Sequence, residues 1–267
     1  MQSGGIGSEK PSASGLPLAA VEAATPAPSI TLVSLGICSY RAARLRQDEL
    51  ISLRTENRIP DTIIYCEHEP VLTLGRRLNG CSDPEIPQRI GSPWNLDQWR
   101  EHGIDVVRCS RGGEATYHGP GQLVIYPVIS LRDRRIGVAD FVATISQAIC
   151  LFLNDRYLLK LGLAAEFDIR CPGIWVPSSG ARLKIGSVGL RICRGVSDHG
   201  FSVNMNCDLV PFAKFSPCGQ KDSAVTSVAA LTGIATGFES AASEIHRQTE
   251  QLLNPDHCSG KLPVRKD

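Results

Sequence analysis

Hydrophobic spacing along the chain alternates between strand-like and helix-like patterns. Apolar residues recur at helical spacing in three segments, which predicts helices over Tyr40 to Asn57, Val138 to Leu161 and Glu239 to Leu253. Short apolar runs bounded by Gly, Pro or polar residues predict strands at Ile30 to Leu35, Thr62 to Cys66, Val71 to Leu74, Asp105 to Cys109, Leu123 to Ile129, Ile174 to Val176, Arg182 to Ile185, Val188 to Ile192 and Phe201 to Met205. Strands dominate the centre and helices lie singly among them. The predicted fold class is therefore α+β, a mixed β-sheet with packed helices.

The two ends of the chain differ from the centre. Residues 1–30 are rich in Gly, Ser, Ala and Pro and contain no large aromatic side chain, so we expect a disordered N-terminal tail. One catalytic or binding domain is expected over residues 31–255, followed by a C-terminal tail at residues 256–267. The first segment has glutamates and no arginine, unlike a mitochondrial transit peptide, and it lacks a secretory signal, which predicts a cytoplasmic location.

Composition narrows the classes of partner. With 267 residues, 42% of them hydrophobic, the chain is long enough to bury a sizeable core. The formal net charge is only +1, so no global field attracts nucleic acid, and no apolar run has the length expected of a membrane span. We therefore expect neither a nucleic-acid nor a membrane partner.

The ten cysteines are scattered and form no CxxC pair, so we interpret them as reduced thiols. Their spacing argues against a structural zinc site, although ligands distant in sequence could still converge. A Walker A sequence and a Rossmann fingerprint are also missing. The sequence thus predicts no metal and no cofactor.

The densest cluster of polar groups is the glycine-rich stretch from Arg111 to Gln122, interpreted as a loop between strands. Four glycines and a proline require sharp turns or a close approach to another group. Arg, Thr, Tyr and His side chains are interleaved with them, which suits a ligand carbonyl or a phosphopantetheine-type arm. A solvated turn with a satisfied histidine is the simpler alternative.

A second candidate is Cys218, which lies between Pro217 and Gly219 at a predicted turn. A free thiol is mostly protonated at neutral pH, so a nucleophilic Cys218 needs a nearby cation to lower its pKa. The candidates are a protonated histidine and the lysines Lys184, Lys214 and Lys221. Buried cysteines more often act as small hydrophobes, and strand lysines are more often solvated.

These pieces, in this order, resemble the octanoyltransferases of lipoate synthesis. The resemblance runs from about residue 30 to about residue 245 and is carried by five separated motifs: EHEPVLTLGR from Glu67, RGGEATYHGPGQLVIYP from Arg111, LKIGSVGLR from Leu183, HGFSVNMNCDL from His199 and SPCG from Ser216. It implies a fold like that of biotin and lipoate protein ligases and an acyltransferase that works by a ping-pong reaction.

In that reaction Cys218 attacks the octanoyl thioester of acyl carrier protein, and Lys184 lowers the pKa of the thiol. A lysine ε-amine on a lipoyl domain, of a 2-oxoacid dehydrogenase complex or of the glycine cleavage H protein, then accepts the acyl group. The resemblance assigns the acyl pocket to Arg111, Gly112, Gly113, Glu114, Ala115, Thr116, Tyr117, His118, Ser187, Val188, Gly189, Gly200, Phe201 and Ser202. His118 is expected to position groups rather than carry protons.

The chain departs from the family at two pocket positions. Ser202 stands where the family usually has alanine, and Val188 replaces a common leucine, so the preferred acyl length stays open. A basic rim for an acidic carrier protein is expected among Arg76, Arg77, Arg132, Arg134 and Arg135, for which solvated loop arginines are an equally simple interpretation.

Three other functions compete with this one. An amidotransferase that moves octanoyl or lipoyl groups between protein lysines would share the cysteine and differ in its donor. An ATP-dependent lipoate or biotin ligase would share the fold, and its activity would survive the substitution Cys218→Ala. A catalytically dead acyl-binding or carrier-binding protein would form no acyl-enzyme.

Overall fold

The computed structural model describes Met1 and residues 29–178, 180–216 and 224–254. Its strands are β1 (Thr31–Cys38), β2 (Thr62–His68), β3 (Val71–Leu74), β4 (Asp105–Arg108), β5 (Ala115–His118), β6 (Gln122–Val128), β7 (Glu166–Asp168), β8 (Gly173–Ser178), β9 (Ala181–Cys193) and β10 (Val196–Asn204). Its helices are α1 (Tyr40–Thr55), α2 (Ile86–Ile90), α3 (Leu96–Glu101), α4 (Val138–Leu153), α5 (Val228–Thr232) and α6 (Phe238–Leu253), with short helical turns η1 (Arg76–Leu78), η2 (Asn154–Leu158), η3 (Leu159–Leu161) and η4 (Val210–Lys214).

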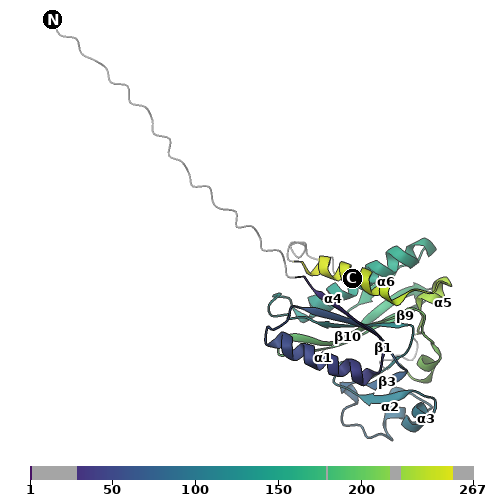
Figure 1. Cartoon of the computed structure of the whole chain (residues 1–267). Helices are drawn as coiled ribbons and strands as arrows, with labels where there is room; N and C mark the ends of the chain where they lie inside the picture. The colour runs from purple at the N-terminus through teal and green to yellow at the C-terminus, as the bar shows by residue number, and fades with distance from the viewer. Residues whose placement is uncertain (2–28, 179, 217–223, 255–267) are drawn as a thin grey trace.

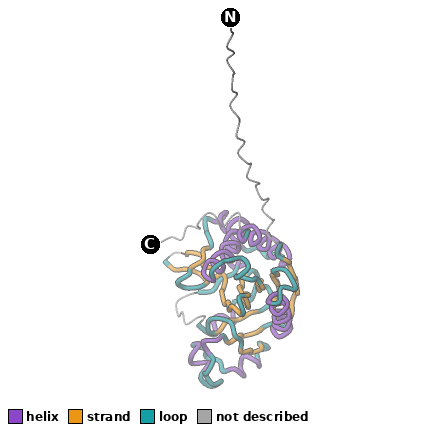
Figure 2. Tube along the Cα trace, turned by 90° about the vertical axis from the view of Figure 1, so that its left-hand side faces the viewer, coloured by secondary structure: helices purple, strands orange, loops and turns teal. Residues whose placement is uncertain are grey.

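Seven strands form the main sheet in the order β1-β2-β6-β10-β9-β8-β7. Only the β1–β2 pair is parallel, so the sheet is mixed. Helix α1 covers one face and the packed pair α4 and α6 covers the other, so the strands lie between helical layers (Figures 1 and 2). This is the arrangement expected when both faces of a sheet are apolar.

Side-chain alternation along the central strands assigns residues to the two faces. In β2, Ile64 and Cys66 pack in the cluster with Ala43 and Leu50 of α1. Ile63 and Tyr65, which alternate with them along the strand, belong to the cluster with α4 and α6. Helix α1 starts at the Ser39 side chain, whose hydroxyl oxygen accepts the Ala42 N–H at 3.2 Å, a standard N-cap.

A smaller sheet of three strands, β4-β3-β5, lies at the end of the molecule that carries α2 and α3 (Figure 1). It has its own apolar cluster, in which Trp99 is fully buried against Phe215 and Leu72 packs beside them. The side chains of Tyr117 and Phe212 meet edge to face in the same cluster. This second core fixes β5 and the loop that precedes it.

Two predictions within the strand pattern are wrong. Part of the stretch predicted as a loop, Ala115–His118, is strand β5, because it pairs antiparallel with β3 in the register Val71↔His118. Its glycines lie on either side of the paired residues, and Thr and Tyr favour strands. The two short strands predicted after Arg182 form the single strand β9, because Gly186 pairs with both neighbours and does not interrupt the ladder.

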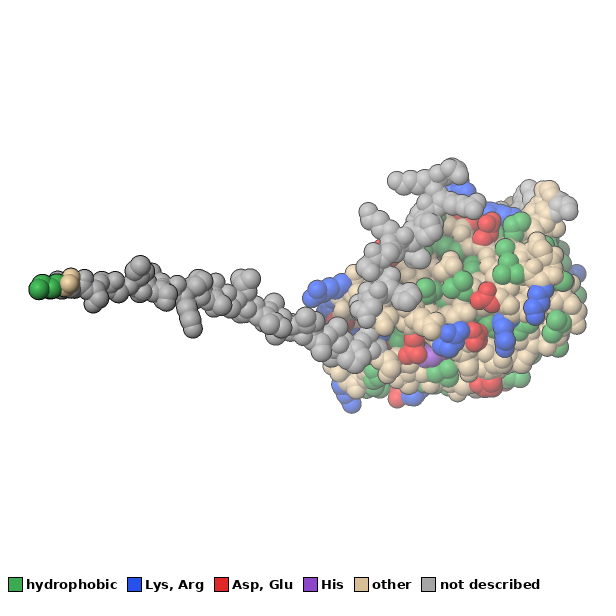
Figure 3. Space-filling view, turned by 90° about the horizontal axis from the view of Figure 1, so that it is seen from above, with side chains coloured by type: hydrophobic (Ala, Val, Ile, Leu, Met, Phe, Trp, Pro, Cys, Tyr) green, Lys and Arg blue, Asp and Glu red, His purple; other side chains and the backbone are tan. Residues whose placement is uncertain are grey.

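The predicted helices agree with α1, α4 and α6 to within a few residues, except that the apolar run from Val138 ends as α-helix at Leu153 and continues to Leu161 as η2 and η3. The run Val138–Leu161 is long and apolar enough to cross a membrane by length and composition alone, but half of its most apolar window is buried inside the fold, as in the core helix of a globular domain. Figure 3 shows acidic and basic side chains interspersed with apolar ones on the face seen from above.

The fold extends slightly beyond the predicted domain start. Ile30 is buried, its N–H donates to Glu250 Oε1 at 2.7 Å, and its carbonyl lies 2.9 Å from His246 Nε2. The predicted tails at residues 1–30 and 256–267 fall otherwise almost wholly outside the described residues, and stay predictions.

Candidate functional site

A cavity lies between the α1-side face of the main sheet and the chain leading into β5. Val124 and Tyr126 of β6 form part of its wall, together with Gly200 of β10 and Gly189 of β9. Tyr40, the first residue of α1, covers another part. The cavity thus forms where the two sheets meet, at a position fixed by both cores.

The residues predicted to form an acyl pocket converge on this cavity from three separate motifs. Those that line it are Arg111, Gly112, Gly113, Ala115, Thr116, His118, Ser187, Val188, Gly189, Gly200, Phe201 and Ser202. The lining residues Tyr40, Val124, Tyr126 and His199 were not predicted. Val124 and Tyr126 lie within the quoted RGGEATYHGPGQLVIYP motif, and strand alternation after Gln122 is the signal that could have identified them.

Two predicted pocket residues point elsewhere. The Glu114 side chain faces Arg89, with 3.4 Å between Oε1 and Nη2. Tyr117 packs into the core of the smaller sheet beside Phe212, because alternate residues of β5 face opposite sides. Glu114 instead contributes its backbone: its carbonyl accepts the Gly75 N–H at 2.7 Å.

Arg111 holds the glycine-rich loop in place. Its buried guanidinium donates to Thr73 through Nε (3.0 Å to Oγ1) and Nη2 (2.6 Å to the carbonyl), and through Nη1 to the Gly112 carbonyl at 2.9 Å. Such a multidentate, charge-assisted contact fixes the orientation of the side chain. Arg111 therefore fastens the loop to β3 at the edge of the cavity.

Two glycines allow the backbone segments to approach closely. A Cβ on Gly200 would lie 2.0 Å from the Ile125 carbonyl oxygen and 2.8 Å from Pro127 Cδ, so no side chain fits there. Gly112 sits against β9, where its N–H donates to the Leu190 carbonyl at 3.3 Å. These contacts join the loop and the main sheet into one continuous wall.

His118 is buried at the cavity wall. Its Nδ1 lies 2.5 Å from Gln122 Oε1, which is consistent with the ring donating its proton to the amide oxygen. Burial, with a smaller contribution from the neighbouring His68, lowers the pKa of His118 to about 3. The imidazole is therefore neutral throughout the physiological pH range, as expected of a positioning group.

Lys184 lies on β9, three residues before the cavity-lining Ser187. Its side chain is buried, with Nζ 5.2 Å from the centre of the Trp175 ring. A Cβ on Gly173 would lie 3.0 Å from Lys184 Cε, so the glycine makes room for the lysine stem. The β8–β9 ladder slips by one residue beside Trp175, and such irregularities commonly re-aim side chains near functional sites. Because the Lys184 side chain is buried, the alternative interpretation of a solvated strand lysine is wrong.

Cys218 lies outside the described residues. The described residues before and after it have defined anchors. On one side the Ser216 N–H donates to the Ile90 carbonyl at 2.8 Å, and on the other the Ala224 carbonyl accepts the Lys184 N–H at 2.9 Å. Ala224, the first described residue after Cys218, is therefore hydrogen-bonded to the strand that carries Lys184.

The arginines predicted as one basic rim are divided in two. Arg76 and Arg77 are exposed next to the glycine-rich loop, and the Arg77 N–H donates to the Gly113 carbonyl. Arg134 is largely buried in an ion pair with Asp61, at the opposite end of β6. Only Arg76 and Arg77 are placed beside the cavity.

Comparison with known proteins agrees with this geometry. A family model described as the lipoyl protein ligase A/B catalytic domain matches residues 39–250. The octanoyltransferase of Alkaliphilus metalliredigens (strain QYMF) is 36% identical over 227 residues, covering 85% of this chain and 96% of that protein. The octanoyltransferase of Desulfotalea psychrophila (strain LSv54 / DSM 12343) is 37% identical over 211 residues, covering 79% of this chain and 86% of the relative.

Solved structures share the fold. A lipoate-protein ligase A crystallised with ATP superimposes with a TM-score of 0.63 at 18% identity, covering 85% of this chain and 86% of that one. A bipartite lipoate protein ligase from Thermoplasma acidophilum gives 0.59 at 16% identity, covering 84% of each chain. The prediction of an α+β fold like that of lipoate protein ligases is confirmed.

Proposed function

This chain belongs to the lipoyl protein ligase A/B catalytic-domain family and is an octanoyltransferase, an acyltransferase of protein lipoylation, and from that premise we propose that it works through an acyl-cysteine on Cys218. The donor is the octanoyl thioester of acyl carrier protein. The acceptor is the ε-amine of a lysine on a lipoyl domain, and the reaction is the first step of endogenous protein lipoylation.

The chemistry proceeds in two transfers. The Cys218 thiolate attacks the thioester carbonyl, a new C–S bond forms, and the carrier leaves as its thiol. The acceptor amine then attacks the acyl-cysteine, a C–N bond forms, and Cys218 leaves with the proton lost by the amine. Amide formation from a thioester is downhill, so the sequence of steps uses neither ATP nor a metal.

Lys184 is the activator in this scheme. A buried cation next to a thiol favours the thiolate, because the charged form gains an attractive interaction that the neutral form lacks. The observation that carries the proposal is that Lys184 is buried on the strand whose next residues, Ser187 to Gly189, line the cavity. Ala224, six residues after Cys218 in the sequence, accepts the Lys184 N–H through its carbonyl, which also supports the pairing of these two residues.

The cavity is the proposed octanoyl site. Apolar groups from Val124, Val188 and Phe201 suit an alkyl chain, and the polar loop suits the thioester end. Because Val188 and Ser202 both line the cavity, the two departures from the family stand where they would alter the fit of the acyl tail. His118, neutral and held by Gln122, acts there as a positioning group.

Two partners follow from this function, the carrier protein and the lipoyl domain. Exposed Arg76 and Arg77 beside the glycine-rich loop are the proposed contacts for the acidic carrier, since charge complementarity guides such encounters. A cytoplasmic location, where both partners would be made, completes the proposal.

The deciding experiment is intact-mass spectrometry after mixing the chain with octanoyl carrier protein in the absence of ATP. The wild type should gain one octanoyl group, which hydroxylamine or an apo lipoyl domain removes, and Cys218→Ala should gain none. Octanoyl transfer by Cys218→Ala with ATP and free octanoate would indicate a ligase instead. Acylation of wild type from an octanoylated lipoyl domain, and not from the carrier, would indicate an amidotransferase. No acylation from any donor would indicate a binding protein.

A further inference from the structure

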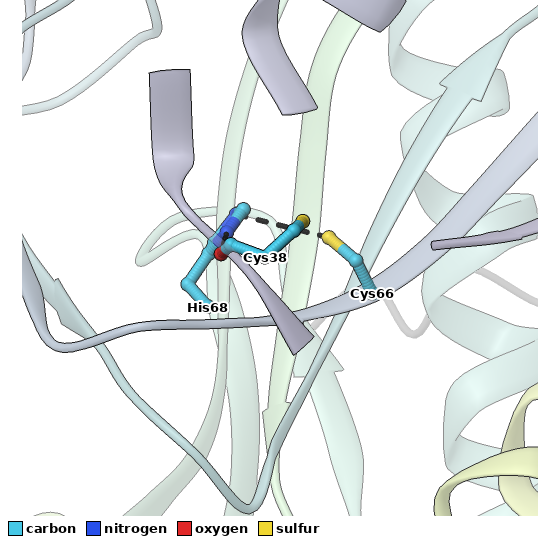
Figure 4. A group of neighbouring side chains, drawn as sticks. All are labelled: Cys38, Cys66 and His68. Atoms are coloured by element: carbon cyan, nitrogen blue, oxygen red, sulfur yellow. Dashed lines mark hydrogen bonds between the residues drawn. The ribbon is translucent and has the colours of Figure 1, made fainter. Parts of the chain in front are cut away.

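Behind the cavity wall, two cysteines and a histidine from adjacent strands point toward one another (Figure 4). Cys38 ends β1, whereas Cys66 and His68 lie on the same face of β2. The two Sγ atoms and a ring nitrogen of His68 all lie within 4.8 Å of one another. We propose that this group is a binding site for a thiophilic divalent ion of the zinc class.

The spacing of the donor atoms suits such an ion. Zinc bonds of about 2.3 Å to sulfur and about 2.0 Å to nitrogen place tetrahedral ligand atoms roughly 3.5–3.8 Å apart. The Cys66 Sγ and His68 Nε2 atoms are 3.8 Å apart. A shift of the partly exposed Cys38 side chain, the most adaptable of the three, brings the third donor into the same range.

The histidine is already oriented as a metal ligand. His68 Nδ1 lies 3.2 Å from the Cys38 carbonyl, which accepts the ring proton and leaves the lone pair on Nε2. A backbone carbonyl is one of the common partners of the second ring nitrogen in a metal-binding histidine. The Tyr126 hydroxyl, 2.7 Å from Nε2, donates to that lone pair in this structure, and the ion would replace this hydrogen bond.

Charge and access also suit the ion. Two thiolates and a neutral imidazole balance a divalent cation, so the buried site gains no net charge. Thiolates select zinc-like ions over magnesium or calcium, which prefer oxygen. Cys66 and His68 are fully buried, whereas Cys38 is partly exposed, so we expect the ion and a water molecule as fourth ligand to enter from the side of Cys38.

A disulfide fits the geometry less well. The residue opposite Cys38 in the β1–β2 ladder is His68, so Cys66 is a diagonal neighbour. A disulfide needs Cα atoms roughly 4.4–6.8 Å apart, and the diagonal position in this parallel pair sets Cys66 farther from Cys38 than the directly opposite residue. A disulfide would also leave the orientation of His68 without a role.

This candidate metal site is not recognisable from sequence spacing, because 27 residues separate its two cysteines. It lies directly behind the proposed acyl site: the His68 ring meets His118 edge to face, with 5.7 Å between ring centroids, and Tyr126 belongs to both. The proposal does not depend on Cys218 or on octanoyl transfer.

The test is binding of Co²⁺ and Zn²⁺ to the reduced full-length chain after chelator treatment. We expect one Co²⁺ per chain with thiolate-to-metal absorption, displaced by Zn²⁺, and competition with a chromophoric chelator gives the affinity. Cys38→Ser should weaken binding at least about tenfold, and Cys66→Ser likewise. Matched variants Cys193→Ser and Cys218→Ala should bind as wild type does, with folding of each variant checked by circular dichroism.

Three outcomes would overturn the proposal. One is the absence of stoichiometric binding by the reduced wild type. Another is wild-type affinity in folded Cys38→Ser, which would place the ion elsewhere. The third is equal weakening in Cys193→Ser or Cys218→Ala, which would indicate adventitious binding to scattered thiols.

Discussion

The side chains of Gln122 and Asn204 are joined by a buried hydrogen bond, 2.8 Å from Nε2 to Oδ1, between neighbouring strands β6 and β10. Gln122 also holds His118 at the cavity wall. Asn204 in turn donates through Nδ2 to the Thr226 carbonyl at 2.9 Å, and the Thr226 N–H donates to the Lys184 carbonyl at 2.9 Å. A continuous polar chain thus connects the cavity wall with the strand that carries the proposed activator.

Asn204→Ala should therefore impair both stability and transfer. It removes the Asn204 donor from the Thr226 carbonyl and one of two acceptors from Gln122 Nε2, which keeps the Tyr117 carbonyl at 3.3 Å; a buried polar group left unsatisfied costs about 1–3 kcal/mol of unfolding free energy. Chemical denaturation measures the loss, and kcat should fall more than the carrier KM rises, because Lys184 is displaced and the docking surface is not. The control is Asn206→Ala, whose side chain is exposed and bonded to Thr236. Equal effects of the two variants would contradict a special role for the chain.

The fold was predictable where one hydrophobic period dominates. Helix α6 and strand β3 follow their patterns almost residue for residue, because each buries one stripe or one short run. Strand β5 was missed because its pairing with β3 is a long-range choice that glycine-rich local sequence does not encode. Helix α6 begins at Phe238, one residue before the predicted start at Glu239.

The candidate site was predictable in its residues more than in its geometry. Motif resemblance identified the three segments that converge on the cavity, yet it could not separate Thr116, which lines the cavity, from Tyr117, which packs into the second core. That separation depends on strand β5, which the sequence interpretation lacked. Tyr40 escaped notice because it comes from α1, far from every motif.

Lys184→Ala should slow alkylation of Cys218 at neutral pH. If Lys184 lowers the thiol pKa by about 2 units from about 8.5, its loss reduces the thiolate fraction at pH 7 at least roughly tenfold. Peptide-level mass spectrometry after timed iodoacetamide treatment is required, because Cys38 also has its pKa lowered, to about 5, by the hydrogen bond from Cys66 and by His68. Lys214→Ala is the control. An unchanged pH profile at Cys218 in Lys184→Ala would remove Lys184 from its proposed role.

Gly200→Ala should destabilise the fold at the cavity wall. The added methyl group would lie 2.0 Å from the Ile125 carbonyl oxygen, so β6 and β10 must separate, and overpacking of this kind costs about 1–3 kcal/mol or more. The measurement is the thermal midpoint together with octanoyl transfer. Gly237→Ala is the matched control, since its Cβ meets no atom within 4 Å and its φ of −72° suits alanine. A Gly200→Ala protein as stable as the control would contradict the packing of these two strands.

Acid should destabilise the protein partly through His118 and His199. Burial lowers their pKa values to about 3 and about 4, whereas an unfolded histidine titrates near 6.5. Between those values the unfolded chain binds more protons than the folded one, so stability falls as the pH drops from about 6.5 toward 4, by up to about 1.4 kcal/mol per pH unit for each group. Above pH 7 neither residue contributes a pH dependence.

His118→Gln should flatten that fall. Unfolding free energies measured between pH 4 and 7 should decline less steeply in the variant than in wild type, because one of the two buried bases is gone. His102→Gln, at an exposed ring stacked on Trp94, is the control and should follow wild type.

Because the pKa of His118 is about 3, the pH profile of wild-type octanoyl transfer should show no inflection from His118 between pH 5 and 8. An inflection there that His118→Gln abolishes would assign the proton-carrying role to His118 and exclude a purely positioning one.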